Sequence, residues 1–333
     1  MIEHIRKRPG LAVLALVLVA SGCTHNANNT NNTDGSDITF TSQKAITVQN
    51  FTITPMVAYS NGNPVTLRLS LKNTGESTAE DVAARLGGPP IDWACQDENP
   101  TNSFEDSEGE PCNFVTFGDM KPGDKEANIP AIPKTRSWSL TPPDRGDRTI
   151  DYTFDSTVYF KYSTQAQTKL TFMTMSEWRT QGTPQRNTPK LENTAAPVKL
   201  EIMTTTPIIT GRGSNDRMCI RIRNVGGGTT FNPAASAGRD GQVEYDMRPR
   251  FRKYVKIRVN DAGGVNFEHV SDGGQVAEVD IPRSRKTART CYEMNPPELG
   301  TGSASRTVPI TLNATYGYMK STSAVMTVKG TPN

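Results

Sequence analysis

Apolar and polar side chains alternate along several segments of this chain, and this alternation constrains the fold more than any other feature. Residues 65–72 read Val-Thr-Leu-Arg-Leu-Ser-Leu-Lys, and residues 218–223 read Met-Cys-Ile-Arg-Ile-Arg. Successive side chains of a β-strand point to opposite faces, so both segments predict strands with one buried face. Apolar residues make up only 35% of the chain, and Thr, Asn, Gly and Pro are frequent, as in short strands joined by turns. We therefore expect an all-β protein.

The two halves of the chain repeat the same order of features. The first strand runs into Asn73-Thr74-Gly75, and its counterpart runs into Asn224-Val225-Gly226. Residues 158–164 and 169–172 close the first half, residues 314–318 and 324–328 close the second, and each pair is expected to form a terminal β-hairpin. Such duplication predicts two domains, at residues 38–175 and 197–333, joined by a linker at 176–196 that is rich in Thr, Pro, Asn and Gln.

A set of short motifs in the first half resembles a known family. After the strand that ends in Asn73-Thr74-Gly75 come residues 79–82 and then residues 115–124, Val-Thr-Phe-Gly-Asp-Met-Lys-Pro-Gly-Asp. The combination resembles the Ig-like β-sandwich modules of prokaryotic surface proteins called CARDB (cell adhesion related domain found in bacteria). The resemblance covers residues 38–175 and, more weakly, 197–330, where a Pro-Gly turn is missing. It implies two tandem Ig-like β-sandwich domains and, by analogy alone, a role in adhesion.

The N-terminus has the features of an export signal. Arg6, Lys7 and Arg8 precede an apolar run at residues 11–20, which is too short to span a bilayer as a mature helix. Ala20-Ser21-Gly22-Cys23 resembles a lipobox, with Ala20 where that family usually has leucine. The resemblance implies a signal peptide at 1–22, a lipid on Cys23, and display at the cell surface or outer envelope. The alternative is an ordinary secretory signal with Cys23 incidental. Residues 23–37 are polar and low in complexity, which predicts a flexible, disordered tether.

The other four cysteines are Cys95, Cys112, Cys219 and Cys291. An exported chain enters an oxidising compartment, where paired cysteines persist as disulfides. Of the three connectivities, we favour Cys95–Cys112 and Cys219–Cys291 because each pair then falls within one predicted domain. A cysteine-based metal site is not expected, since no C-x-x-C motif or neighbouring histidine is present.

Charge is distributed unevenly, although the net charge is only +3. Residues 24–190 hold 15 basic and 20 acidic residues, giving −5, and residues 191–333 hold 19 and 13, giving +6. The acidic half contains a carboxylate-rich segment between two cysteines: Asp97, Glu98, Glu105, Asp106, Glu108 and Glu110. Oxygen-rich loops of this kind can hold calcium, and the alternative is a solvated loop that the disulfide constrains. No other cofactor is expected.

The basic half contains a cationic segment, formed by Arg248, Arg250, Arg252, Lys253, Lys256 and Arg258. Its near-alternate spacing predicts several cations on the open face of one strand, which is also what a solvated or charge-guarded strand shows. Acidic glycans, anionic headgroups, other surface proteins or the acidic half of another copy are the expected partners, and nucleic acid is not.

Two further signals bear on modification and catalysis. Four Asn-x-Thr sequons begin at Asn28, Asn31, Asn50 and Asn313. They are either glycosylation sites or chance occurrences in a chain rich in Asn and Thr. A Ser-His-Asp site is suggested by the segment Phe267-Glu268-His269-Val270-Ser271-Asp272, but no G-x-S-x-G elbow accompanies it. We therefore expect no enzyme but a lipid-anchored adhesion or ligand-binding module. The alternatives are a subunit of a head-to-tail filament or layer, and an accessory lipoprotein of a secretion or pilus machine.

Overall fold

The computed structural model describes residues 45–88, 93–95, 114–182, 184–210, 216–233, 254–260, 263–282, 285–299 and 303–331. All of them belong to one compact unit of the chain, Ile38–Asn333. Strands in three sheets make up nearly all of its regular structure, so the predicted all-β sandwich class is confirmed. Within these ranges there is no helix long and apolar enough to cross a membrane.

The first sheet has four strands in the order β1-β3-β7-β5 and comes entirely from the first half of the chain. Its strands are β1 Ile46–Thr54, β3 Val65–Asn73, β7 Lys134–Thr141 and β5 Ala94–Cys95. β3 is the strand predicted from alternation. Val65, Leu67, Leu69 and Leu71 are all fully buried, and the residues between them are half-buried or exposed.

The second sheet repeats this arrangement with strands of the second half, in the order β10-β12-β17-β15. Its strands are β10 Val198–Ile202, β12 Asp216–Asn224, β17 Thr287–Asn295 and β15 Asn266–His269. β12 contains the second predicted strand and pairs with β10 as β3 pairs with β1. The predicted internal repeat is therefore visible in the strand pairing.

The third sheet has ten strands, and both halves contribute to it. Its main path is β16-β14-β18-β8-β4-β6, and β2, β9, β11 and β13 pair with β8 or β18. The bounds are β2 Val57–Tyr59, β4 Ala79–Gly87, β6 Phe114–Met120, β8 Ile150–Thr174, β9 Glu192–Asn193, β11 Ile208–Thr210, β13 Thr229–Phe231, β14 Tyr254–Asn260, β16 Val276–Asp280 and β18 Ser305–Lys329.

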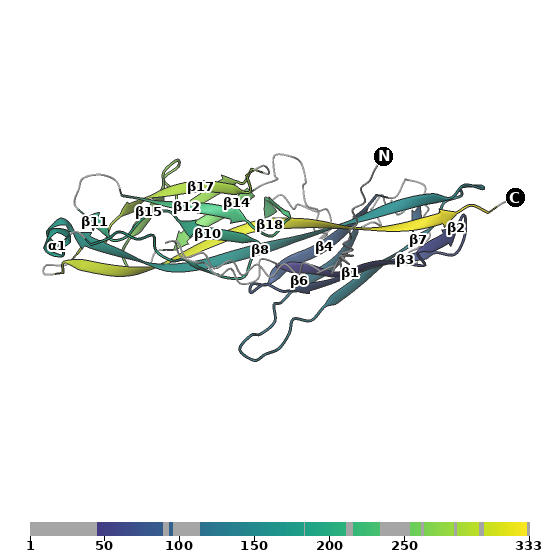
Figure 1. Cartoon of the computed structure of the whole chain (residues 1–333), viewed down its shortest axis with the longest axis horizontal. Coiled ribbons are helices and arrows are strands. Elements are labelled where there is room, and N and C mark those ends of the chain that lie inside the picture. The colour runs from purple at the N-terminus through teal and green to yellow at the C-terminus, as the bar shows by residue number, and fades with distance from the viewer. Residues whose placement is uncertain are drawn as a thin grey trace, which may run out of the picture. The chain divides into compact units, whose positions relative to one another are not determined.

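The two predicted terminal hairpins are wrong. Each is one continuous strand of 25 residues, β8 in the first half and β18 in the second. These strands lie side by side in antiparallel register, from the Ile150–Val328 pair to the Met173–Ser305 pair (Figure 1). Neither segment has a Gly, Pro, Asn or Asp where the hairpin turn was expected, at 165–168 or 319–323. The alternation therefore continues unbroken, and the two strands pair with each other.

The β8–β18 ribbon relates the two halves by a pseudo-two-fold axis. Tyr162 and Tyr318 occupy equivalent places, since each hydroxyl accepts a hydrogen bond from the turn that follows β3 or β12. In the ribbon, Tyr162 pairs with Tyr316 and Phe160 pairs with Tyr318. An axis that exchanges Tyr162 with Tyr318 also exchanges Phe160 with Tyr316. It therefore passes through the pair between them, Lys161 and Gly317.

One face of the ribbon is buried and the other is mostly open. Even-numbered residues such as Phe154, Phe160, Phe172 and Leu312 are 0–2% exposed and belong to the one large core cluster, which also includes residues of both four-stranded sheets. Odd-numbered residues point away from this core. Near the middle of the ribbon, Tyr159 packs against Phe231 in a small second cluster, and towards the ends the odd-numbered side chains of β8 are mostly exposed or half-buried.

The predicted linker contributes to the fold. Helix α1, Met175–Thr180, follows β8 directly, and the Thr174 hydroxyl caps it by accepting from the Glu177 N–H at 3.2 Å. β9 adds to the edge of β8, and Leu191, Ala195 and Ala196 are buried. The domain boundaries at 175 and 197 stay a prediction.

Candidate binding face

Polar side chains from four neighbouring strands form a continuous surface, to which both halves of the chain and the predicted linker contribute. Directly paired residues of adjacent strands share a face. Arg258 pairs with Asn313, which pairs with Gln165. We call this surface the polar face. It consists of Lys256, Arg258 and Asn260 on β14, Thr311, Asn313 and Thr315 on β18, Ser163, Gln165, Gln167 and Lys169 on β8, and Glu192 on β9.

The side chains of the polar face are exposed or half-buried, and the residues between them are buried except for Thr168, which is half-buried. On β14, Lys256 and Arg258 are exposed, whereas Val255, Ile257 and Val259 are at most 2% exposed. The predicted alternation of this basic strand is therefore confirmed for its described residues. Backbone pairing on both sides of β18 and β8 fixes the spacing of the polar groups, so the face is a rigid array of amides, hydroxyls and cations.

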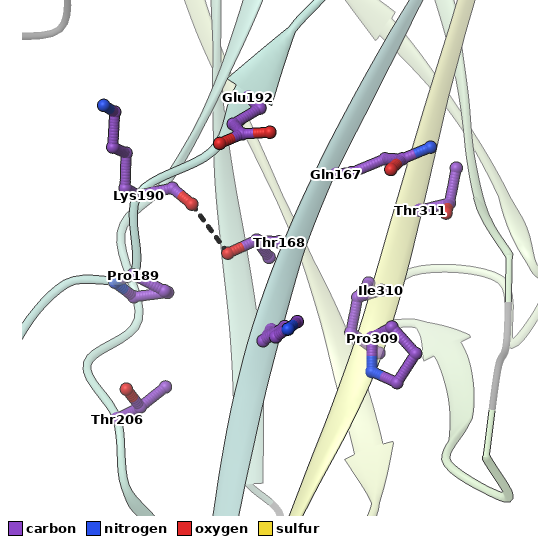
Figure 2. Close-up of a pocket in the computed structure, with 10 residues that line it drawn as sticks. Gln167, Thr168, Pro189, Lys190, Glu192, Thr206, Pro309, Ile310 and Thr311 are labelled. Carbon is purple, nitrogen blue, oxygen red and sulfur yellow. Dashed lines mark hydrogen bonds between the residues drawn. The ribbon is translucent and has the colours of Figure 1, made fainter.

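A groove of about 550 Å³ crosses one edge of the polar face. It opens where the chain at Pro189 and Lys190 separates from β8, and Gln167 and Thr311 line it from the ribbon (Figure 2). Lys169 of β8 also lines it. The Thr168 hydroxyl donates to the Lys190 carbonyl at 2.8 Å and holds the two walls together. The groove is open to solvent, and polar and apolar atoms contribute about equally to its lining, which suits part of an extended ligand that presents both kinds of group.

The charge of this region is mixed, with cations in excess. Lys169, Lys190, Lys256 and Arg258 contribute four positive charges, and Glu192 and Glu278 contribute two negative charges. On the neighbouring strand β16, Glu278 pairs with Lys256 in the ladder and accepts a hydrogen bond from the Tyr254 hydroxyl at 2.6 Å. Desolvation, followed by this contact with Glu278, raises the pKa of Tyr254. The polar face therefore favours anionic or neutral polar groups.

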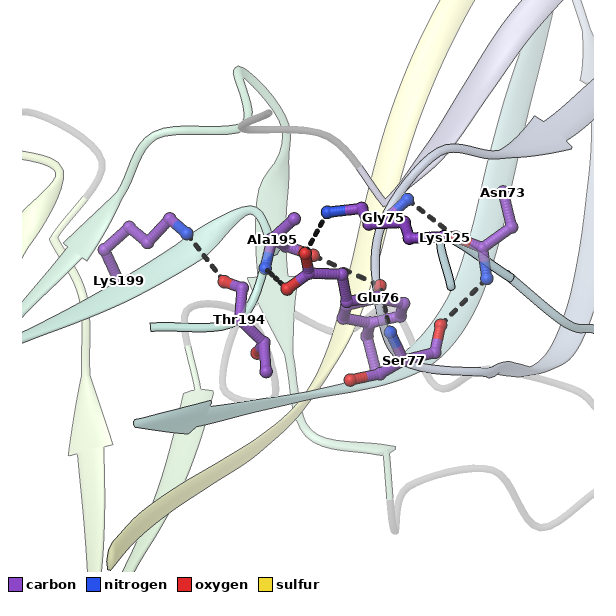
Figure 3. A network of polar contacts seen from close by, with 9 residues as sticks. Asn73, Gly75, Glu76, Ser77, Lys125, Thr194, Ala195 and Lys199 are labelled. Atoms are coloured by element: carbon purple, nitrogen blue, oxygen red, sulfur yellow. Dashed lines mark hydrogen bonds and ion pairs between the residues drawn. The ribbon is translucent and has the colours of Figure 1, made fainter. Parts of the chain in front are cut away.

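A second polar cluster joins the two halves at the middle of the unit. Glu76, in the turn after β3, binds the ammonium of Lys125 and accepts from the Ala195 N–H at 2.7 Å (Figure 3). Burial opposes ionisation of Glu76, but the bonds from Lys125 and Ala195 outweigh it and lower the pKa of the carboxyl. Lys199, only 1% exposed, donates to the Thr194 carbonyl at 2.6 Å. Burial lowers the pKa of Lys199, and the charge of Glu76 opposes that shift. These contacts hold the halves together.

His269 does not form a Ser-His-Asp triad. Its Nδ1 lies 2.9 Å from Asp272 Oδ1 and 2.9 Å from Ser271 Oγ, so the carboxylate and the serine share one ring nitrogen. A triad needs the serine on the opposite nitrogen. That nitrogen, Nε2, instead lies 2.9 Å from the hydroxyl of Thr290, a residue of β17 that is 7% exposed. The cluster ties the turn after β15 to β17, and the expectation of a non-catalytic protein stays a prediction.

The predicted Cys219–Cys291 disulfide is confirmed. The two cysteines face each other on β12 and β17, and the Arg289 guanidinium donates to Cys219 Sγ at 3.0 Å. Cys95 ends β5, but its side chain and Cys112 lie outside the described residues, so their pairing stays a prediction.

The structure describes only some of the other residues that the sequence singles out. Asn50 is exposed at a bulge in β1, and Asn313 is half-buried on the polar face. The described residues contain no cluster of three or more metal-ligating side chains. Outside them lie Cys23, Asn28, Asn31, the acidic segment Asp97, Glu98, Glu105, Asp106, Glu108 and Glu110, and the basic residues Arg248, Arg250, Arg252 and Lys253. Their predicted roles, including calcium binding, stay untested.

The polar face itself was missed, except for Lys256 and Arg258. A weak signal for it exists, because Ser163, Gln165, Gln167 and Lys169 alternate with buried or half-buried residues. That pattern also describes any solvated strand, so only the strand neighbours could reveal the array.

Comparison with known proteins identifies no family. No protein-family model and no curated protein matches the chain. Among solved structures, it is similar to the enterococcal surface protein, partial N-terminal region, with 11% identity, 85% of this chain and 86% of that chain covered, and a TM-score of 0.19. A likeness of this size supports no conclusion about function.

Proposed function

We propose that the chain is an exported surface protein that binds ligands without catalysis, and that its polar face binds an extended anionic polysaccharide. The observation that carries the proposal is the polar face with its groove at Gln167, Lys169 and Thr311. Side-chain amides and hydroxyls can exchange hydrogen bonds with sugar hydroxyls, and the four nearby cations provide partners for carboxylate or sulfate groups.

Export and anchoring rest on the sequence and on one structural feature. The sequence places a lipobox-like Cys23 and a polar tether before the folded unit. The Cys219–Cys291 disulfide is typical of a protein that matures in an oxidising compartment. A lipid on Cys23 would hold the folded unit at the envelope, where a polysaccharide ligand is accessible.

Glycosylation of Asn313 is incompatible with this proposal, although Asn313 begins an Asn-x-Thr sequon. Asn313 lies at the centre of the polar face, between Arg258 and Gln165. A glycan attached to it would cover the array. Intact mass measurement of the native protein therefore tests the proposal independently, and complete occupancy of Asn313 would contradict it.

Binding of dextran sulfate and of neutral dextran to residues 38–333 tests the proposal directly. We expect dextran sulfate to bind, and the double substitution Lys169→Glu with Arg258→Glu to weaken that binding at least tenfold. The matched control is Arg68→Glu, since Arg68 is exposed on β3 in the first sheet. If the control and the double variant weaken binding equally, the attraction is non-specific and the proposed face is wrong.

A head-to-tail assembly is the second candidate, because the first half carries −5 and the second +6 by the counts given above. Such a contact between unlike surfaces does not stop at two copies unless it closes into a ring. Attraction between exposed charges weakens with ionic strength. Growth of particle mass at low salt that reverses at high salt would favour this candidate over the binding module.

A further inference from the structure

Exposed apolar side chains gather around the short strand β2. Met56 is 68% exposed, Val57 44%, Tyr59 58% and Val325 52%. Together they are half of the large apolar side chains that are exposed in the described part of the chain. We call these four residues the β2 patch. β2 pairs in parallel with the end of β18, where Val57 lies opposite Thr327 and Tyr59 opposite Lys329.

The internal repeat shows that the equivalent strand in the second half is covered. Thr-Pro precedes both strands, as Thr54-Pro55 before β2 and Thr206-Pro207 before β11. β11 pairs in parallel with the end of β8, just as β2 pairs with the end of β18. However, Ile208 and Ile209 of β11 are only 5% and 3% exposed, and helix α1 packs beside them. By contrast, Met56, Val57 and Tyr59 at the equivalent strand of the first half are 44–68% exposed.

The backbone of β2 has an outer edge suited to another strand. The Thr327 N–H donates to the Met56 carbonyl at 3.0 Å, and the Ser60 N–H donates to the Lys329 carbonyl at 2.8 Å. The Met56 carbonyl and the Ser60 N–H therefore point toward β18. Backbone groups alternate along a strand, and those of Val57 and Tyr59 therefore point to the opposite edge. The Tyr59 carbonyl also accepts from Gly62 N–H at 2.9 Å in the following turn.

We infer that a second copy of this chain covers the β2 patch, with the two β2 strands paired antiparallel about a two-fold axis at Ala58. In this register the outward backbone N–H and C=O groups of Val57 form hydrogen bonds with those of Tyr59 in the second copy. By symmetry, Tyr59 of the first copy pairs with Val57 of the second. Val57 and Tyr59 also share a face, because Ala58 between them is 4% exposed and points inward. The pairing therefore sets a β-branched side chain beside an aromatic one, a favourable cross-strand combination.

The size of the patch predicts a weak dimer. Given side-chain areas of up to roughly 150–250 Å² and the exposed fractions above, the patch offers on the order of 400 Å² per copy, or about 800 Å² for two copies. This total is below the roughly 1,000 Å² of a stable specific interface and fits a weak, transient one. A two-fold contact uses the same surface on both copies and closes at two. It therefore differs from a head-to-tail assembly, and because its contacts are apolar and backbone groups, high salt is not expected to dissociate it.

Sedimentation of residues 38–333 over a concentration series tests the inference. We expect the mass to rise from one copy to two and to stop there, with no loss of dimer at high salt. Val57→Lys with Tyr59→Lys should leave a monomer at every concentration, because lysine on an edge strand opposes pairing. The matched control is Ile132→Lys, since Ile132 is an apolar residue 79% exposed outside the patch, and it should dimerise as the wild type does. A wild-type monomer throughout, or equal loss in the control, would overturn the inference.

Disulfide trapping keeps the test independent of any folding defect in the lysine variants. Hydrogen-bonded residues of antiparallel strands have Cα atoms about 5.5 Å apart, a distance that a disulfide can span. A mixture of the Val57→Cys and Tyr59→Cys variants should therefore give a covalent dimer on mild oxidation, at a yield several-fold above that of either variant alone. Equal yields in all three samples would contradict the proposed register.

Discussion

At the scale of single residues, two tyrosine hydroxyls hold the turns that follow β3 and β12. The Tyr318 hydroxyl accepts from the Gly228 N–H at 2.7 Å and donates to Asn224 Oδ1 at 2.8 Å. The Tyr162 hydroxyl accepts from the Ser77 N–H at 3.0 Å. Burial raises the pKa of both tyrosines to about 12, so the hydroxyls keep their protons at neutral pH.

We expect Tyr318→Phe to lower the free energy of unfolding by about 1–3 kcal/mol, because it leaves the Gly228 N–H without its acceptor in a partly buried site. Urea denaturation measures the change. Tyr59→Phe is the control, since Tyr59 is 58% exposed, and at protein concentrations below the dimer range it should change the value by less than about 0.5 kcal/mol. Equal effects of the two substitutions would show that the buried hydroxyl does not stabilise the turn.

Glu76 predicts a specific loss of stability in acid. Lys125 and Ala195 hold its pKa below the usual 4.5 in the folded state, so the unfolded chain binds more protons as the pH falls. The stability that Glu76 contributes is therefore present above pH 4.5 and is lost as the pH falls through the folded pKa. Glu76→Gln should make the loss of stability between roughly pH 5 and pH 3 shallower, and Lys125→Met should act in the same direction. Parallel pH profiles for wild type and Glu76→Gln would contradict this assignment.

At the scale of elements, the repeated turns depend on glycine for close approach. An added Cβ at Gly226 would lie 2.5 Å from the Tyr318 hydroxyl and would overlap Pro197. An added Cβ at Gly75 would lie 2.8 Å from the Ala195 carbonyl oxygen and would overlap the Tyr162 hydroxyl. The two Asn-x-Gly turns that the sequence revealed are therefore equivalent in packing as well as in sequence.

Gly75→Ala and Gly226→Ala should each destabilise the protein by about 1–3 kcal/mol, the usual cost of overpacking. Thermal or urea unfolding checks the values. Gly274→Ala is the matched control, because the nearest atom to its new Cβ would be Asp272 Oδ1 at 3.6 Å, an ordinary contact. A control that is as unstable as the turn variants would show that the loss comes from substituting any glycine.

Single strands could be predicted from the sequence, but their partners could not. The alternation at Val65–Asn73 and Asp216–Asn224 identifies both strands because each buries one face. The same alternation in β8 and β18 gave the wrong prediction of two hairpins, because alternation alone does not distinguish a hairpin from one long strand. The pairing of β8 with β18 makes each segment one long strand, and it joins residues more than 120 positions apart. The polar face depends on the same long-range register.

At the scale of the whole folded unit, the β8–β18 ribbon gives the protein one buried face and one face with long open stretches. Both four-stranded sheets contribute to the core on the same side, which leaves the odd-numbered side chains of the ribbon towards its ends free to meet a ligand. Most of the short helix α1, and the wall of the groove formed by Pro189, Lys190 and Glu192, lie in the segment that the sequence predicted as a linker. Composition alone could not reveal them, since Leu191 and Ala196 become buried only against the strands.

Hydrogen exchange of residues 38–333 with and without dextran sulfate shows whether the polar face binds an anionic polysaccharide. We expect slower exchange at β9, at Tyr254–Asn260 and in the segments of β8 and β18 that form the polar face, with no change in β1 and β3. Protection confined to the first sheet, or spread evenly over both halves, would contradict binding at the polar face.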